Sequence, residues 1–128
     1  MGETENRAVI DRLYARVWIS EDHDFDVMDE SFAEDAVVEY PQSGERIRGR
    51  ENIRAVEEDY PGLPKVELRR KLVVGDIAVV EAKLDYQGKP YDEVSIFEFR
   101  DGKIVRHTSY FAEPFEAPER RAQWVEKM

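Results

Sequence analysis

The residue best suited to proton transfer in this sequence is His107, in the run KIVRHTSYF near the end of the chain. An unperturbed imidazole titrates near pH ~6.5, so it can take up and return a proton close to neutrality. If the run is a β-strand, Val105, Ser109 and Phe111 share the face of His107, because strand side chains alternate. Two interpretations stay open: His107 is a general acid or base, or it is a packed histidine with its hydrogen bonds satisfied inside the protein.

Carboxylates and phenols are the groups that could work with this histidine. Glu57 and Glu93 could supply an orienting carboxylate. Alternation puts Glu93 on the inward side of its strand with Ser95, whereas a charged surface position is the expected one for Glu57, because an unpaired glutamate is seldom buried. The hydroxyls of Tyr40 and Tyr86 either orient a polar ligand group or belong to structural aromatics. Tyr14 lies at the edge of an apolar stripe, where a tyrosine also packs ordinarily. The histidine is therefore the clearest proton carrier that the sequence offers.

Composition excludes several classes of function. The 128 residues are 41% hydrophobic, which is enough for one domain spanning 1–128, and the formal net charge of -10 argues against binding nucleic acid or an anionic membrane surface. The absence of cysteine excludes disulfides and thiol chemistry. No signal peptide or apolar run of about 20 residues stands out, so we expect a soluble, cytoplasmic protein. The acidic clusters 21–26 and 57–59 are expected to be solvated, with no metal site and no cofactor.

The first half of the chain is predicted to be largely helical. Apolar residues recur at helical spacing over Thr4–Ser20, and Asp24 can cap a second, shorter helix that ends near Phe32. A turn is expected at Glu34-Asp35, and a third helix is expected over Arg50–Tyr60, before the helix-breaking Pro61-Gly62.

The second half is predicted to be a meander of strands. Asp101-Gly102 between two β-rich runs is a strong hairpin signal, and earlier turns lie at Gly75-Asp76 and at residues 87–90. Helices followed by a curved antiparallel sheet define an α+β domain. A C-terminal extension of about 114–128 adds a short helix over Glu119–Met128, whose Trp124 is expected to pack. The predicted strands are Ala36–Tyr40, Glu45–Arg48, Lys65–Val74, Ile77–Tyr86, Tyr91–Phe99 and the strand after Gly102 that reaches Phe111.

The order of these elements, with FAEDAVVEYP after two helices and DGKIVRHTSYF near the end, resembles the nuclear transport factor 2-like superfamily. Within it the chain looks most similar to the SnoaL-like and ketosteroid-isomerase-like branches, over Ala8 to about Pro114. The resemblance implies a cone-shaped fold, in which N-terminal helices pack in a strongly curved antiparallel sheet. It also implies an apolar pocket at the open end and a homodimer formed through the sheet.

The resemblance assigns roles by position. Tyr14 falls where ketosteroid isomerases keep the tyrosine that donates a hydrogen bond to the developing enolate. Tyr40 falls where they keep the carboxylate that moves the proton, Ser95 approximately where they keep a second donor, and Ser109 where many SnoaL-like proteins have an aspartate. Hydroxyls thus stand at three positions where relatives have carboxylates, so steroid isomerisation itself is not expected.

Two hypotheses follow. In the first, a small hydrophobic carbonyl or enol ligand is isomerised, cyclised or dehydrated by proton transfer through His107, with Tyr14 and Tyr40 holding the oxygen. In the second, the chain is a non-catalytic ligand-binding or dimerisation domain with a degenerate pocket. An epoxide-hydrolase-like activity would need an Asp-Arg-Asp arrangement around a water molecule. Arg70 is expected on the inward side with Leu68 and Leu72, but the sequence offers no two inward aspartates to accompany it. The predicted pocket consists of Trp18, Tyr60, Leu84, Tyr86, Ser95, Phe97, Ser109 and Phe111 around the three catalytic candidates.

Overall fold

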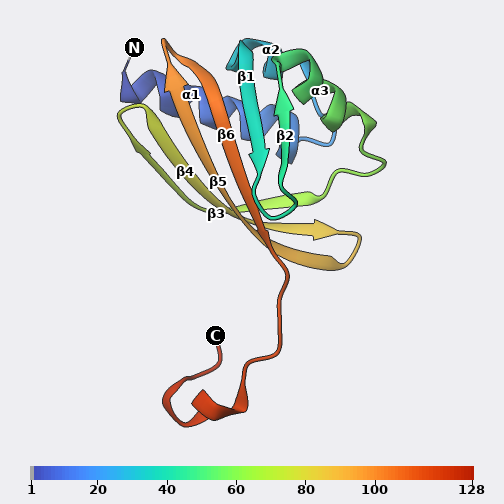
Figure 1. Cartoon of the computed structure of the whole chain (residues 1–128), viewed down its shortest axis with the longest axis vertical. Helices are drawn as coiled ribbons and strands as arrows, with labels where there is room; N and C mark the ends of the chain where they lie inside the picture. The colour runs from blue at the N-terminus through green and yellow to red at the C-terminus, as the bar shows by residue number, and fades with distance from the viewer. Residues whose placement is uncertain (1) are drawn as a thin grey trace.

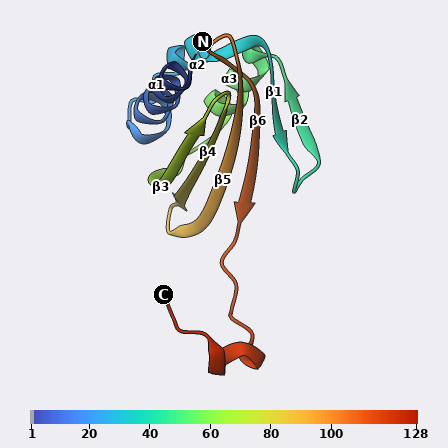
Figure 2. The ribbon, with the colours of Figure 1, turned by 90° about the vertical axis from the view of Figure 1, so that its left-hand side faces the viewer.

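A computed structural model describes residues 2–128, in which helices cover the concave side of one six-stranded sheet (Figures 1 and 2). The helical elements are α1 (Glu3–Leu13), the π-helical η1 (Tyr14–Ile19), α2 (Asp26–Ser31), α3 (Arg50–Asp59) and the 3-10 helix η2 (Glu119–Trp124). The strands are β1 (Phe32–Tyr40), β2 (Glu45–Arg48), β3 (Lys65–Val74), β4 (Ile77–Tyr86), β5 (Lys89–Arg100) and β6 (Lys103–Ala112). The predicted α+β cone is confirmed.

The sheet has the order β2-β1-β6-β5-β4-β3. Strands β3 to β6 form the expected antiparallel meander, and β2 pairs antiparallel with β1. The prediction of an entirely antiparallel sheet is wrong at one place, because β1 and β6 run parallel. The meander brings its last strand to the middle of the sheet, where β6 joins the separate β1–β2 hairpin to the other strands (Figure 1).

Irregular pairing bends the sheet and moves side chains to faces that simple alternation does not predict. The register shifts between Leu68 and Arg70 on β3, and again where Glu98 and Phe99 face Arg106 and Ile104. A bulge inserts an extra residue and bends its strand. As a consequence Ile104, which simple alternation would put on the face opposite to that of His107, is fully buried.

The same effect corrects the predicted inner face of β3. Leu72 was expected to point inward but is 55% exposed. Arg70 is expected inward by the same alternation, yet it pairs in register with the outward Glu81, and its Nε lies 3.5 Å from a carboxylate oxygen of Glu81. Arg70 therefore cannot serve the Asp-Arg-Asp arrangement of an epoxide hydrolase.

The helices differ from the prediction at their ends. The helix expected over Thr4–Ser20 widens into a π-helical turn from Tyr14 onward. The turn expected at Glu34-Asp35 is wrong, since these residues lie inside β1, where the pairing with β6 is irregular between Phe32 and Val37. Asp24 does accept a hydrogen bond from the Asp26 N–H at 3.2 Å, at the start of α2. The core between helices and sheet contains Ile10, Leu13, Val17, Val27, Met28, Phe32, Val80, Phe97 and Ile104.

The C-terminal extension leaves the domain instead of packing on it. After β6 the chain runs away from the sheet and ends in η2 at a distance from the helices and strands (Figures 1 and 2). Phe115 is 81% and Trp124 is 76% exposed, so the packing expected for this segment is not found. Among residues 2–128, no helix combines the length and the apolar character needed to cross a bilayer.

Candidate functional site

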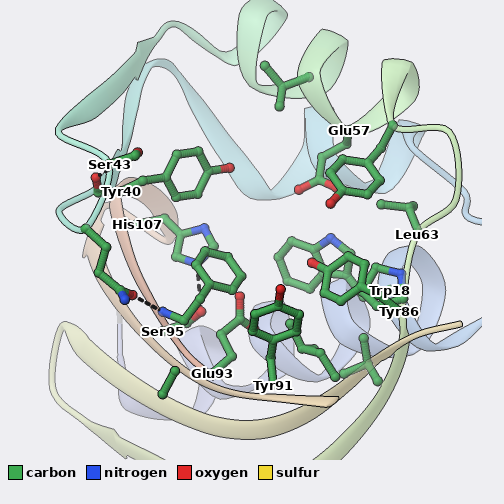
Figure 3. Close-up of a pocket in the computed structure, with 18 of the residues that line it drawn as sticks. Trp18, Tyr40, Ser43, Glu57, Leu63, Tyr86, Tyr91, Glu93, Ser95 and His107 are labelled. Carbon is green, nitrogen blue, oxygen red and sulfur yellow. Dashed lines mark hydrogen bonds between the residues drawn. The ribbon is translucent and has the colours of Figure 1, made fainter. Parts of the chain in front are cut away.

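A cavity of about 960 Å³ lies inside the curve of the sheet (Figure 3). Its floor is formed by β4, β5 and β6, one wall by η1, and the opposite wall by α3 with the loop that follows it. The β1–β2 hairpin contributes Tyr40, Gln42 and Ser43 to the rim. Bulges in the sheet produce this concave surface, because a flat sheet would bring the helices into direct contact with it.

His107 lies on the floor and is tied to two serines. Its Nε2 is 3.0 Å from Ser95 Oγ and 2.9 Å from Ser109 Oγ, and the two hydroxyls are 3.3 Å apart. The β5–β6 register explains this cluster, since Ser95 is directly opposite Ser109 and His107 is opposite Phe97. The imidazole stacks on the Phe97 ring at a centroid distance of 4.1 Å, and its Nδ1 is turned toward the cavity (Figure 3).

Burial changes the acid–base behaviour expected of His107. The side chain is only 7% exposed, and its desolvation lowers its pKa to about 3, because the charged imidazolium loses its hydration. The ring is therefore neutral at pH 7. A neutral imidazole can still donate or accept one hydrogen bond through Nδ1, but it is a weak base for proton abstraction.

Tyr14 and Trp18 reach the cavity from the π-helical turn. The two side chains are four residues apart, and their rings meet edge to face at 4.7 Å. π-Helical turns are rare and frequently occur at functional sites. Burial raises the pKa of Tyr14 above its ordinary value; the charge of Glu93 adds to this, and the Ser95 hydroxyl opposes it. Tyr14 thus stays protonated and is placed near both Glu93 and Ser95.

Two glutamates project into the cavity from different elements. Glu57 descends from α3 and Glu93 rises from β5, with Trp18 between them (Figure 3). Burial raises the pKa of Glu57 to about 7, and the nearby side chains of Trp18 and His23 oppose this shift. The expected surface position of Glu57 is wrong, whereas Glu93 lies on the inward side, where alternation along the strand placed it.

Glu93 is the less compensated of the two carboxylates. Burial and, to a smaller extent, the charge of Glu57 together raise its pKa to about 7; neither a hydrogen bond nor a cation contributes. Its strand neighbours explain its orientation, because Glu93 pairs in register with Ala82 on one side and Phe111 on the other, both on the inner face. The pair of glutamates thus provides groups that titrate near neutrality, where His107 does not.

Aromatic rings cover much of the remaining wall. The ring centroids of Tyr40 and Phe111 are 5.9 Å apart, as are those of Tyr86 and Tyr60. The rings of Tyr86 and Tyr91 meet edge to face with a centroid distance of 5.4 Å. Burial raises the pKa of both Tyr40 and Tyr86, and nearby glutamates add to the effect. These phenols are therefore neutral hydrogen-bonding groups set in an apolar wall.

The structure brings nine of the eleven predicted site residues to the cavity surface and leaves two behind it. Phe97 is fully buried beneath the imidazole, and Ser109 is buried beside it, so both support His107 without lining the cavity. The nine that line it are His107, Tyr14, Tyr40, Trp18, Tyr60, Leu84, Tyr86, Ser95 and Phe111.

The lining residues that sequence reasoning underrated had detectable signals. Glu57 lies one helical turn after the buried Ile53, and Glu93 alternates with Ser95 and Phe97 on the inward side of β5. For Glu57 the general rarity of buried glutamate outweighed this local pattern.

The acidic connector before α2 does not form a metal site. Arg16 lies 2.8 Å from Asp24, and Arg54 lies 2.8 Å from Asp26, so arginines already neutralise these carboxylates. His23 points its Nδ1 at the Val17 carbonyl oxygen at 2.5 Å. Across residues 2–128, no cluster of three or more His, Cys, Asp or Glu side chains is arranged to hold a metal ion.

A strongly curved sheet that encloses a ligand-sized cavity under its helices defines the cone-shaped class of α+β domains typified by nuclear transport factor 2 and ketosteroid isomerase. The model of the SnoaL-like domain matches residues 10–107, and the chain belongs to this family. No curated protein matches the sequence.

Solved structures agree with this assignment. A nuclear transport factor 2-like protein of unknown function from Burkholderia xenovorans is 40% identical, with a TM-score of 0.86 over 98% of this chain and 97% of that chain. A putative ketosteroid isomerase from Kribbella flavida is 27% identical, with a TM-score of 0.90 over 98% of this chain and 90% of that chain. A protein from Catenulispora acidiphila with a ketosteroid isomerase-like fold, solved in complex with trimethylamine, shares the fold at 17% identity, with a TM-score of 0.67 over 81% of this chain and 85% of that chain.

Proposed function

We propose that this protein is a SnoaL-like enzyme that binds a small hydrophobic carbonyl or enol compound in the cavity and moves a proton within it. The observation that carries this proposal is Glu93, an uncompensated carboxylate with a pKa of about 7 that faces a cavity large enough for a ligand. A general base is most effective when its pKa lies near the working pH. The reaction class is isomerisation, cyclisation or hydration–dehydration. The neighbour solved with trimethylamine supports ligand binding by this fold.

In this proposal Glu93 replaces His107 as the proton carrier. The Glu93 carboxylate removes a proton from the carbon next to the ligand carbonyl, and the bonding electrons move onto the carbonyl oxygen to give an enolate. Tyr14, which is held neutral near Glu93, donates a hydrogen bond to that oxygen. A positioned donor of this kind is worth about 10²–10³ in rate. Return of the proton to a different atom completes an isomerisation.

His107 contributes as a neutral hydrogen-bonding group. With its proton on Nδ1, the ring offers an N–H to the cavity while Nε2 accepts from a serine hydroxyl, for which Ser95 and Ser109 both lie within 3.0 Å. A second donor to the enolate oxygen at this place would act with Tyr14. The low pKa of about 3 serves this role, because it keeps the ring in one charge state at neutral pH.

Exchange of carbon-bound protons tests the proposal without knowledge of the natural substrate. Hydrophobic ketones such as 2-tetralone are incubated with the protein in D₂O, and loss of the signal from the protons next to the carbonyl is followed by NMR. We expect catalysed exchange that falls by about 10²-fold or more in Glu93→Gln and that is unchanged in Glu98→Gln, whose carboxylate pairs with Arg106 at 3.5 Å outside the cavity. Equal exchange by wild type and Glu93→Gln across such a panel would refute Glu93 as the base.

The hydroxyls of Tyr40, Ser95 and Ser109 favour a second function, because ketosteroid isomerases or SnoaL-like proteins have carboxylates at these positions. In that case the chain binds an apolar ligand without transforming it. Native mass spectrometry of freshly purified protein distinguishes the two, because a retained molecule that is recovered unaltered, together with no exchange activity, favours the binding domain.

We further propose a homodimer formed through the convex face of the sheet. Apolar side chains stand exposed there on three strands, namely Leu72, Val74, Ile77 and Tyr110 from β3, β4 and β6. Register places Leu72 beside Val79 and then Ile96, so the apolar surface is continuous across neighbouring strands. An exposed apolar surface of this kind is typical of an interface between subunits.

A further inference from the structure

The cavity carries negative charge that no cation within it balances. Two carboxylates, Glu57 and Glu93, project into its interior, and Glu45 and Glu113 lie among the lining residues. Lys89 is the single Lys or Arg among the lining residues of the described chain. Its ammonium is already engaged, 3.4 Å from Glu113 and 5.4 Å from the centre of the Tyr91 ring.

Glu93 is the side chain that most requires an external partner. Among residues 2–128, no hydrogen bond and no ion pair stabilises its ionised carboxylate. The one charge that shifts its pKa is the like charge of Glu57. Glu93 is half-buried, so its carboxylate loses part of its hydration without gaining a partner, and a cationic ligand that pairs with it is favoured. Figure 3 shows both carboxylates directed into the same space on either side of Trp18.

The surfaces around these carboxylates are the faces and edges of aromatic rings. Trp18 lies between them, Tyr86 and Tyr91 form one side, and Tyr40 forms another (Figure 3). Aromatic faces attract cations through the ring quadrupole, and a cage of such rings is a common way to bind an alkylated ammonium. Carboxylates alone would suit a hydrated metal ion, but rings in place of further oxygen ligands do not.

We propose that the ligand of this cavity carries an ammonium group, either a protonated amine or a quaternary one, which is held between Glu57 and Glu93 against Trp18. This inference rests on the proposed function and specifies its substrate class: the hydrophobic body of the ligand occupies the aromatic wall, and its cationic centre lies against Trp18 on the side of Glu57. The Glu93 carboxylate attracts the cation through the cavity but stays free to accept the carbon-bound proton. Anionic ligands are excluded, since they would add to the repulsion between the two glutamates.

A pair of probes of equal shape isolates the charge. Choline and 3,3-dimethylbutan-1-ol differ only in having nitrogen or carbon at the branched centre, so any difference in binding reports the positive charge. Binding is followed by NMR at constant ionic strength, through the indole N–H signal of Trp18. The Trp124→Phe variant assigns that signal, because Trp124 ends η2 and is 76% exposed, away from the cavity.

We expect choline to bind wild-type protein at least about tenfold more tightly than its carbon isostere. Glu93→Gln and Glu57→Gln should each reduce this preference several-fold, while Glu98→Gln should keep it, and dispersed spectra verify that every variant is folded. Equal or tighter binding of the isostere would overturn the ammonium inference and leave ligand binding intact. If neither probe shifts the Trp18 signal, the ammonium inference fails, while the proposed proton-transfer function is decided separately by the exchange of ketone protons in D₂O.

Discussion

Replacing Glu93 by glutamine should stabilise the protein at about pH 8 and have a much smaller effect at about pH 5. The ionised Glu93 carboxylate is desolvated and repelled by Glu57, so folding at high pH carries an electrostatic cost that the neutral amide removes. Active sites often retain such destabilising groups because function requires them. Few substitutions of a cavity residue are expected to raise stability, which makes the sign of this result informative.

The magnitude follows from the difference in proton affinity between the folded and unfolded chain. The pKa of Glu93 is about 7 in the folded protein and 4.5 ordinarily. Because the folded-state pKa is raised, the folded protein holds the proton more tightly, and stability falls as the pH rises from the unfolded value through the folded one. The difference corresponds to roughly 3 kcal/mol, and partial access of solvent to the carboxylate reduces the expected gain in Glu93→Gln to about 2 kcal/mol at pH ~8. At pH ~5 the gain should be below about 1 kcal/mol.

Urea unfolding followed by far-UV circular dichroism at both pH values measures these differences. Glu98→Gln is the matched control on the outer face, and its effect should be small and similar at both pH values. The double variant with Glu57→Gln should gain less than the sum of the single variants, because each substitution already removes the repulsion between the pair. A loss of stability in Glu93→Gln at pH ~8, or a gain that is the same at both pH values, would refute the placement of a desolvated carboxylate at this position.

Three further predictions concern the parts around the cavity. Phe97→Ala should lower the free energy of unfolding by about 3–5 kcal/mol, since Phe97 is fully buried beneath His107, and a loss below about 1 kcal/mol in urea unfolding would contradict that packing. Deletion of residues 115–128 should change the unfolding free energy of the domain by less than about 0.5 kcal/mol, because Phe115 and Trp124 are exposed; a clear drop in melting temperature would show that the extension packs after all. Leu72→Glu should convert the proposed dimer to a monomer in light scattering at matched protein concentration, with Arg7→Glu as the control on an exposed position of α1, away from the convex face, and an unchanged mass would place the interface elsewhere.

Local signals predicted the sheet well. The Asp101-Gly102 pair forms the expected tight turn with φ values of 52° and 77°, and such positive angles at both positions are why this pair favours hairpins. Turns at Gly75 and Gly88, both at positive φ, end the preceding strands as expected. Alternation then placed Tyr86, Ser95 and Phe111 on the cavity side, because strand side chains have a strict period of two wherever pairing is regular.

The errors arose where tertiary structure changes that period or the environment of a side chain. Bulges reversed the faces expected for Ile104 and Leu72, and no residue type in either strand indicates where the extra residue is inserted. The π-helical turn at Tyr14 keeps the apolar spacing of an α-helix and is therefore invisible in the sequence. Burial of Glu57 and the low pKa of His107 depend on elements that meet only in the folded chain, so spacing alone could not predict which group titrates near neutrality.

The proton-carrying role of the glutamates is tested most directly by titrating the side-chain carboxyls with ¹³C NMR, using Glu57→Gln and Glu93→Gln to assign the two signals. Because the groups interact, the apparent pKa values belong to the pair. We expect two glutamate carboxyls of the wild-type protein to titrate near pH ~7. Removal of Glu57 should lower the pKa of Glu93 but leave it above its ordinary value. If both carboxyls titrate near the ordinary value of 4.5 in the wild-type protein, neither is the desolvated proton carrier described above.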